Sequence, residues 1–114
     1  MAVDVKIAYP QAGTSETATF KVHVDQDNNN YFYVYGKSED ATVVGIQILD
    51  LDNDPLPWTI TQVSQGPLHP DHWVFRVSAA SADVFRIKAF ATDGTDSDMD
   101  DHPFIERLNG YSGG

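Results

Sequence analysis

The stretch 84–94, VFRIKAFATDG, constrains the fold of this chain more than any other part of the sequence. Its apolar residues recur at every second position and include Phe85, Ile87, Ala89 and Ala91. A strand gathers such residues on one face, whereas a helix would spread them around its circumference. Asp93 and Gly94 end the run, because glycine tolerates a positive φ and aspartate can bond to its own backbone. The stretch therefore predicts a long core strand that runs into an acidic turn.

Further short segments alternate in the same way or form apolar runs between turns rich in proline, glycine, asparagine and aspartate. They cover residues 3–7, 19–25, 31–36, 42–49, 58–63 and 73–78. The polar turn at 25–30 predicts a hairpin between the segments on either side of it. Residues 93–103 suggest an acidic loop, and 104–108 fit either an edge strand or a short helix. Seven or eight short strands without an amphipathic helix predict an all-β sandwich or barrel.

The length and the charge of the chain bound its class. Its 114 residues suffice for one domain, which we expect over 1–108, with a flexible C-terminal tail over 109–114. The chain has 7 basic and 17 acidic residues and a formal net charge of −10. Such a surface repels phosphate backbones, so we expect no nucleic-acid partner. No apolar run approaches the ~20 residues of a membrane span, so no membrane insertion is predicted.

The chain contains no cysteine, which excludes disulfides, thiolate metal sites and a cysteine nucleophile. This does not fix the compartment, because many large secreted bacterial proteins also lack cysteine. Residues 1–10 lack the basic and apolar regions of a signal peptide. The sequence therefore predicts either a protein that is not exported by that route or a domain cut from a longer chain.

Five segments in a fixed order carry a family resemblance. They are FYVYG at 32–36, VVGIQI at 43–48, WTI at 58–60, WVFRV at 73–77 and FRIKAFATDG at 85–94. The set resembles the bacterial immunoglobulin-like modules of secreted enzymes and surface adhesins, and it covers most of Val3 to Asp96. The resemblance implies an immunoglobulin-like antiparallel β-sandwich of seven or eight strands without shared catalytic residues. The chain departs from it in the dense acidic run Asp96–Asp101 and in the long stretch Ser64–His72.

Two acidic turns place oxygen ligands at close spacing. The candidate ligands are Asp50, Asp52 and Asp54 in the first turn and Asp93, Asp96 and Asp98 in the second. Calcium takes six to eight oxygen ligands on flexible loops, so these residues are candidates for a Ca²⁺ site. An EF-hand does not fit, because the sixth position counted from Asp96 is Asp101 and the twelfth is Arg107. The alternative is that these aspartates only end strands and keep turns solvated.

The histidines form a weaker candidate site. His69, Asp71 and His72 lie within four residues, and two imidazoles with a carboxylate are able to ligate zinc. Their spacing falls in an expected loop rather than on a helix, and His23 is expected to point away from the core. Surface histidines without a metal are the alternative interpretation.

Tyr31, Tyr33 and Tyr35 form a stripe at period two. If Phe32 and Val34 point into the core, the three tyrosines lie on the outer face and make an amphipathic platform suited to sugars or a protein partner. The opposite register would bury the tyrosines instead. A third interpretation is that tyrosine is present only for its strand propensity.

No catalytic constellation is present in the sequence. It has no nucleophile elbow, no P-loop and no dinucleotide-binding glycine pattern. The solvated carboxylates of the turns lack the burial that raises a pKa for general acid catalysis. The sequence thus predicts a non-catalytic spacer or adhesion unit of a larger secreted or surface bacterial protein, in contact with its other domains, a protein or a polysaccharide. The alternatives are a carbohydrate-binding accessory module that uses the tyrosines and a phage virion decoration or tail-associated domain.

Overall fold

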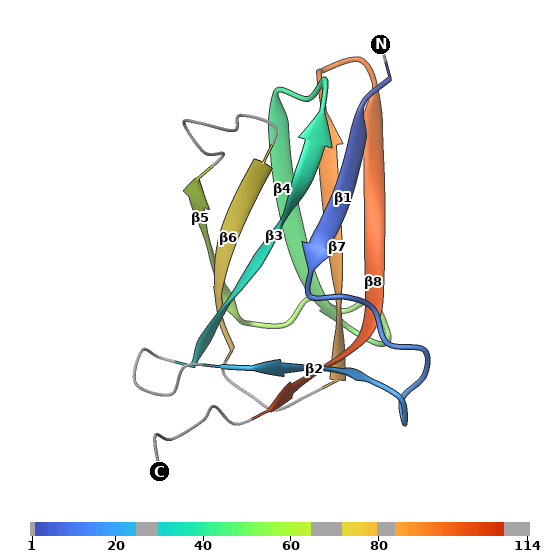
Figure 1. Ribbon diagram of the computed structural model, residues 1–114, viewed down its shortest axis with the longest axis vertical. Coiled ribbons are helices and arrows are strands. Elements are labelled where there is room, and N and C mark those ends of the chain that lie inside the picture. The colour runs from blue at the N-terminus through green and yellow to red at the C-terminus, as the bar shows by residue number, and fades with distance from the viewer. Residues whose placement is uncertain (1, 25–29, 65–71, 80–83, 109–114) are drawn as a thin grey trace.

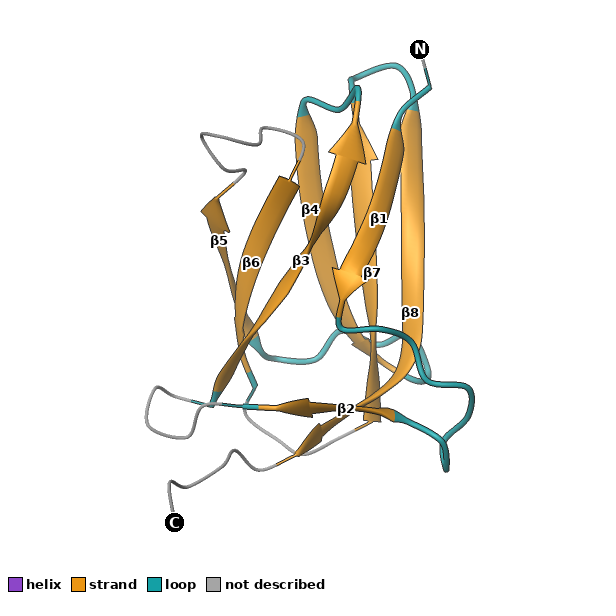
Figure 2. Cartoon of the chain, in the orientation of Figure 1, coloured by secondary structure: helices purple, strands orange, loops and turns teal. Residues whose placement is uncertain are grey.

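Eight strands make up the regular structure of the chain (Figure 1). The computed structural model describes residues 2–24, 30–64, 72–79 and 84–108. The strands are β1 (Asp4–Tyr9), β2 (Phe20–His23), β3 (Tyr31–Glu39), β4 (Val43–Asp50), β5 (Thr59–Ser64), β6 (His72–Ser78), β7 (Val84–Thr92) and β8 (Ser97–Leu108). No helix occurs among the described residues (Figure 2). The predicted all-β class is confirmed, while the expected tail at 109–114 lies outside the described residues.

The strands form two four-stranded sheets that pack as a sandwich. One sheet has the order β1-β3-β6-β5 and the other the order β2-β8-β7-β4. In this arrangement β1, β3, β6 and β5 take the places of strands A, B, E and D of an immunoglobulin sandwich. Strands β4, β7 and β8 take those of C, F and G. The predicted immunoglobulin-like sandwich is thus observed, with β2 as an additional strand.

Two local predictions are wrong. The segments 19–25 and 31–36 do not form a hairpin, because β2 pairs with β8 in parallel whereas β3 lies between β1 and β6 in the other sheet. Residues 93–103 are not a loop throughout, because β8 begins at Ser97 and continues to Leu108. Residues 104–108 belong to the same strand and do not form a short helix. Because β2 pairs with β8 in parallel, the sandwich is not purely antiparallel.

The core lies between the sheets and follows the predicted alternation of β7. Phe85, Ile87 and Trp73 are fully buried, and the ring of Trp58 meets that of Phe85 with centroids 4.9 Å apart. Aromatic pairs of this edge-to-face kind add to the burial of their apolar area. At Gly36 on β3, an added Cβ would overlap the carbonyl oxygen of Lys6 and lie 2.5 Å from Cζ2 of Trp73. Only glycine therefore lets β1 and Trp73 approach β3 this closely.

A row of polar side chains on β8 joins the two sheets along β1. Asp98 and Asp100 lie opposite the buried Ala91 and Ala89 of β7, so they point to the inner side of their sheet. Asp98 Oδ2 accepts a hydrogen bond from the amide of Val5 (3.0 Å), and Asp100 Oδ2 accepts one from the amide of Ile7 (2.8 Å).

His102 continues this row. Its Nδ1 donates to the carbonyl oxygen of Pro10 at 2.8 Å, and its Nε2 lies 3.3 Å from Asp100 Oδ2. An edge strand otherwise presents unpaired amides to solvent or to another chain, so these contacts protect the edge of β1. We call the contacts of Asp98, Asp100 and His102 with residues of 5–10 the aspartate seam.

Candidate binding site on the outer face of β3

The tyrosines of β3 point away from the core. The exposed fractions are 41% for Tyr33 and 45% for Tyr35, against 4% for Phe32 and 0% for Val34. Tyr31 is half-buried at the start of the strand. Since side chains alternate along a strand, the buried Phe32 and Val34 fix the tyrosines on the outer face. The structure therefore has the register that the tyrosine platform requires.

Tyr9 joins this platform through a bulge that the sequence does not reveal. The register between β1 and β3 shifts between Ile7, which pairs with Gly36, and Tyr9, which pairs with Tyr35. Ala8 is the extra residue of the bulge. In a regular strand Tyr9 would share the inner face with Ile7, but a bulge re-aims the side chains that follow it. The bulge thus places Tyr9 beside Tyr35.

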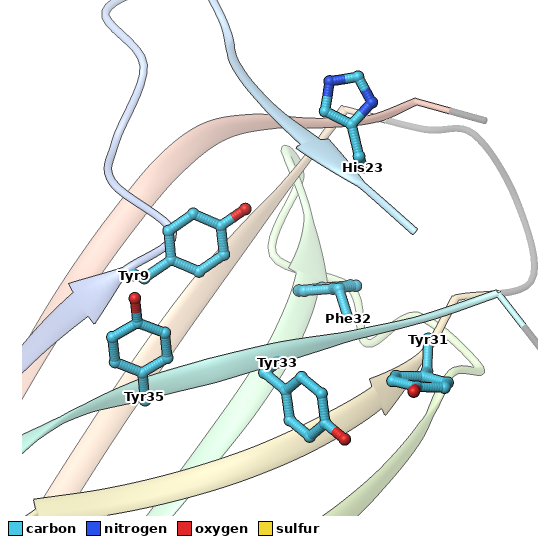
Figure 3. Close-up of a pocket in the computed structure, with 6 residues that line it drawn as sticks. All are labelled: Tyr9, His23, Tyr31, Phe32, Tyr33 and Tyr35. Atoms are coloured by element: carbon cyan, nitrogen blue, oxygen red, sulfur yellow. The ribbon is translucent and has the colours of Figure 1, made fainter. Parts of the chain in front are cut away.

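Tyrosine rings from two strands border a depression of about 370 Å³ (Figure 3). Its lining consists of Tyr9, His23, Tyr31, Phe32, Tyr33 and Tyr35. The rings of Tyr9 and Tyr35 stack with centroids 5.6 Å apart and an interplanar angle of 17°. Tyr31 and Tyr33 meet edge to face at 5.3 Å. The rings support one another, so they form a preorganised surface with apolar ring faces and polar hydroxyl tips.

The hydroxyl of Tyr9 is protonated at neutral pH. Burial raises its pKa above the ordinary 10.0, and the nearby Tyr35 raises the pKa further. A protonated phenol both donates and accepts hydrogen bonds. The depression therefore offers at least one hydroxyl donor beside its apolar rings.

A second depression of about 350 Å³ shares one lining residue, Tyr35, with the first. Its lining consists of Ala8, Tyr35, Gly36, Lys37, His72, Trp73 and Val74. The two depressions follow the outer face of β3 from Tyr31 to Lys37, which is roughly 20 Å at the rise of a strand. We call the pair the tyrosine groove.

The acidic turns do not come together. Asp50 pairs with Phe85 at the beginning of β7, whereas Asp93 follows the far end of the same strand. The two turns therefore lie roughly 25 Å apart along β7. The six predicted ligands, Asp50, Asp52, Asp54, Asp93, Asp96 and Asp98, cannot surround one ion.

The carboxylates of these turns bind backbone amides. Asp50 Oδ1 accepts from the amides of Asp52 (2.8 Å) and Asp54 (2.9 Å). Asp93 Oδ1 accepts from Thr95 (2.8 Å) and Asp96 (2.7 Å), and these hydrogen bonds lower the pKa of Asp93. This is the role that aspartate commonly has in turns. Calcium binding stays a prediction from the sequence.

The histidines are also dispersed. His69 and Asp71 lie outside the described residues, His72 begins β6, and His102 belongs to the aspartate seam. Among the described residues, no group of three or more histidine, aspartate or glutamate side chains is placed to hold a metal ion. His23 instead lines the first depression of the tyrosine groove.

Tyr9 and His23 also belong to this site, and neither is predicted by the sequence. His23 has the outward direction that alternation predicts, but no local pattern brings β2 near β3. By strand alternation Tyr9 should point inward like Val5 and Ile7. Only the register between β1 and β3 reveals the bulge that turns it outward. No signal within either segment points to the groove.

No known protein family, no curated protein and no solved structure matches this chain significantly. The resemblance to bacterial immunoglobulin-like modules therefore stays a prediction, while the sandwich itself follows from the strand order. The described part of the chain contains no helix that could cross a membrane.

Proposed function

We propose that this protein is a non-catalytic immunoglobulin-like module that binds carbohydrate in the tyrosine groove. Its setting would be a larger bacterial protein that acts outside the cell, as the family resemblance implies. The observation that carries the proposal is the exposed, mutually supporting set of rings around the first depression. Aromatic faces pack against the apolar faces of sugar rings, and hydroxyl groups at the rim bond to sugar hydroxyls.

The clustering of the tyrosines favours a binding role over strand propensity alone. The chain has five tyrosines, and four of them, Tyr9, Tyr31, Tyr33 and Tyr35, line this one depression. Strand propensity explains a tyrosine on any strand, but it does not explain why Tyr9 is turned outward by a bulge. Bulges commonly re-aim side chains beside binding sites, which is the role proposed for this one.

The test is a glycan array followed by calorimetric titration of the bound oligosaccharides. Tyr33→Ala and Tyr35→Ala should each lower the affinity about tenfold, which corresponds to a loss of ~1.4 kcal/mol. The free energy of unfolding should change by less than about 0.5 kcal/mol, because both rings are on the surface. Phe90→Ala is the matched control, since Phe90 is an exposed aromatic residue on the other sheet.

The proposal would be contradicted if Tyr33→Ala and Tyr35→Ala left the affinity for the bound oligosaccharide unchanged. A large loss of stability in Tyr33→Ala would also contradict the proposal, because the ring would then belong to the core.

A spacer role is a second candidate, favoured by the path of the chain. β1 begins at one end of the sandwich and β8 ends at the other (Figure 1). Such a path suits serial connection between neighbouring domains. Replacing the module by a flexible linker in a longer parent chain should then change the distance between its neighbours in small-angle scattering. Unchanged scattering would contradict the spacer role.

A further inference from the structure

We propose that the tyrosine groove binds an acidic polysaccharide, one that carries carboxylate or sulfate groups, rather than a neutral one. This inference rests on the proposed carbohydrate-binding function and specifies its ligand. It follows from three observations: the distribution of charge over the sandwich, the cations Lys37 and Arg76 in and beside the groove, and the length of the groove.

Charge is unevenly distributed over the two sheets. The outward positions of β1, β3, β6 and β5 carry the cations Lys6, Lys37 and Arg76 against the carboxylates Asp4 and Glu39. These strand positions therefore carry one more cation than carboxylate, although the chain has a net charge of −10. A cationic face on an acidic protein attracts an anion locally while the remaining surface repels other polyanions.

Lys6 and Lys37 form an unfavourable pair when no ligand is bound. They lie directly opposite each other on β1 and β3, and like charges in such cross-strand pairs are destabilising. Among the described residues, no ion pair within 4 Å joins either lysine to a carboxylate, although Lys6 is close enough to Asp98 to help lower the pKa of that carboxyl. Asp4 and Glu39 pair with each other farther from the tyrosines. An anion in the groove beside Lys37 would relieve this repulsion.

Arg76 places a second cation beside two of the tyrosines that line the first depression, although it is not itself part of the lining. It pairs with Tyr33 across β3 and β6, and its Cζ lies 5.7 Å from the centroid of the Tyr31 ring. The guanidinium interacts with this ring while its N–H groups provide the planar fork that binds carboxylate and sulfate oxygens. No ion pair occupies Arg76 within the described part of the chain.

The order of groups along β3 matches a polymer with repeated charges. Tyr31, Tyr33 and Tyr35 offer ring faces, Arg76 lies beside Tyr33, and Lys37 lies beyond Tyr35 in the second depression. The groove spans roughly 20 Å, which exceeds the length of one sugar ring. Several consecutive sugars with anionic groups would therefore contact aromatic and cationic side chains together.

The experiment compares hexasaccharides of one length by calorimetry: a neutral xylohexaose, a hexagalacturonate and a sulfated hexasaccharide. We expect the acidic ligands to bind at least about tenfold more tightly than the neutral one and to weaken when salt is raised. Arg76→Gln and Lys37→Gln should each lower the ratio of the acidic to the neutral affinity about tenfold. Lys88→Gln is the matched control on the other sheet. The two acidic arms distinguish a uronate from a sulfated ligand.

Two results would overturn the inference and leave the proposed function standing. One is equal binding of neutral and acidic hexasaccharides that depends on Tyr33 but not on Arg76 or Lys37. The other is binding of polyglutamate as tight as binding of the acidic sugars, because charge alone would then suffice. Failure of every oligosaccharide to bind would overturn the proposed function itself.

Discussion

The outer face of β3 and the aspartate seam look alike in sequence and differ in what their side chains do. Both place polar or amphipathic side chains at every second position of a strand. On β3 the rings of Tyr33 and Tyr35 face solvent, while the intervening residues form the core. On β8 the carboxylates of Asp98 and Asp100 face inward and accept hydrogen bonds from two backbone amides of β1.

This difference separates binding from stability. Tyr33 and Tyr35 are 41% and 45% exposed, so the fold depends little on their rings and a ligand can reach them. The aspartates satisfy backbone amides of an edge strand, so the attachment of β1 depends on them. Substitutions on the tyrosine face should therefore affect affinity, and substitutions in the seam should affect the free energy of unfolding.

The largest effect should come from Gly36→Ala, which tests the inner side of the tyrosine strand. The new methyl group would overlap the Lys6 carbonyl and press on the Trp73 ring. Backbone cannot move away as easily as a flexible side chain, so we expect a loss of about 3 kcal/mol or more in urea unfolding. Tyr35→Ala, one residue earlier, is the control and should change stability little. Equal stability of both variants would contradict the close approach of β1.

The next effect should come from Asp98→Ala combined with Asp100→Ala, which removes the two carboxylates of the seam. The Val5 and Ile7 amides would lose charge-assisted hydrogen bonds, although water can partly replace them at this half-exposed edge. We expect a loss of about 2 kcal/mol in the free energy of unfolding. Oligosaccharide affinity should remain unchanged, because the seam lies outside the groove. Asp52→Ala combined with Asp54→Ala keeps the net charge of this variant and serves as its control.

A smaller effect should appear in the pH dependence of stability. The amides of Val5 and Met99 donate to Asp98 and hold its pKa below the ordinary 3.8. A carboxylate with a lowered folded pKa stabilises the fold above its unfolded pKa, and this contribution is lost as the pH falls through the folded pKa. The free energy of unfolding should therefore decrease below about pH 4.

Asp98→Asn isolates this contribution. The amide oxygen can still accept a hydrogen bond but does not titrate, so the variant should show a shallower decrease in urea unfolding between about pH 5 and pH 2. Asp93 and Glu106, whose pKa values are also lowered, are present in both proteins and cancel in the comparison. An unchanged slope would show that Asp98 does not bind the β1 edge.

The sequence predicted the strands whose alternation separates core from solvent. The apolar period of β7 and the alternation of residues 31–36 identified both strands correctly, but the sequence left open which face of β3 is buried. Burial of apolar side chains decides such strands, and that preference is local to each segment.

The sequence could not predict β8, because its period-two side chains are aspartates that suit a turn equally well. Their partners, the amides of Val5 and Ile7, lie 93 residues away in the chain. The parallel pairing of β2 with β8 depends on equally distant contacts. Alternation puts the three tyrosines on one face of β3, but the sequence left open whether that face is buried. The positions of Tyr9 and Arg76 depend on pairing with other strands.

The smallest predicted effect concerns Tyr9. This residue lines the tyrosine groove and lies on β1, the strand that the aspartate seam attaches. Burial and the neighbouring Tyr35 raise its pKa, so an ultraviolet titration of the protein should contain a transition above pH 10. Tyr9→Phe should remove this late transition and leave stability at neutral pH within about 0.5 kcal/mol. Since a raised tyrosine pKa favours the folded state only while the phenol is protonated, the wild-type protein should lose this contribution as the pH rises above about 10. If Tyr9→Phe left the ultraviolet titration unchanged, the ring of Tyr9 would be solvated rather than held against Tyr35, and the bulge would not be building the groove.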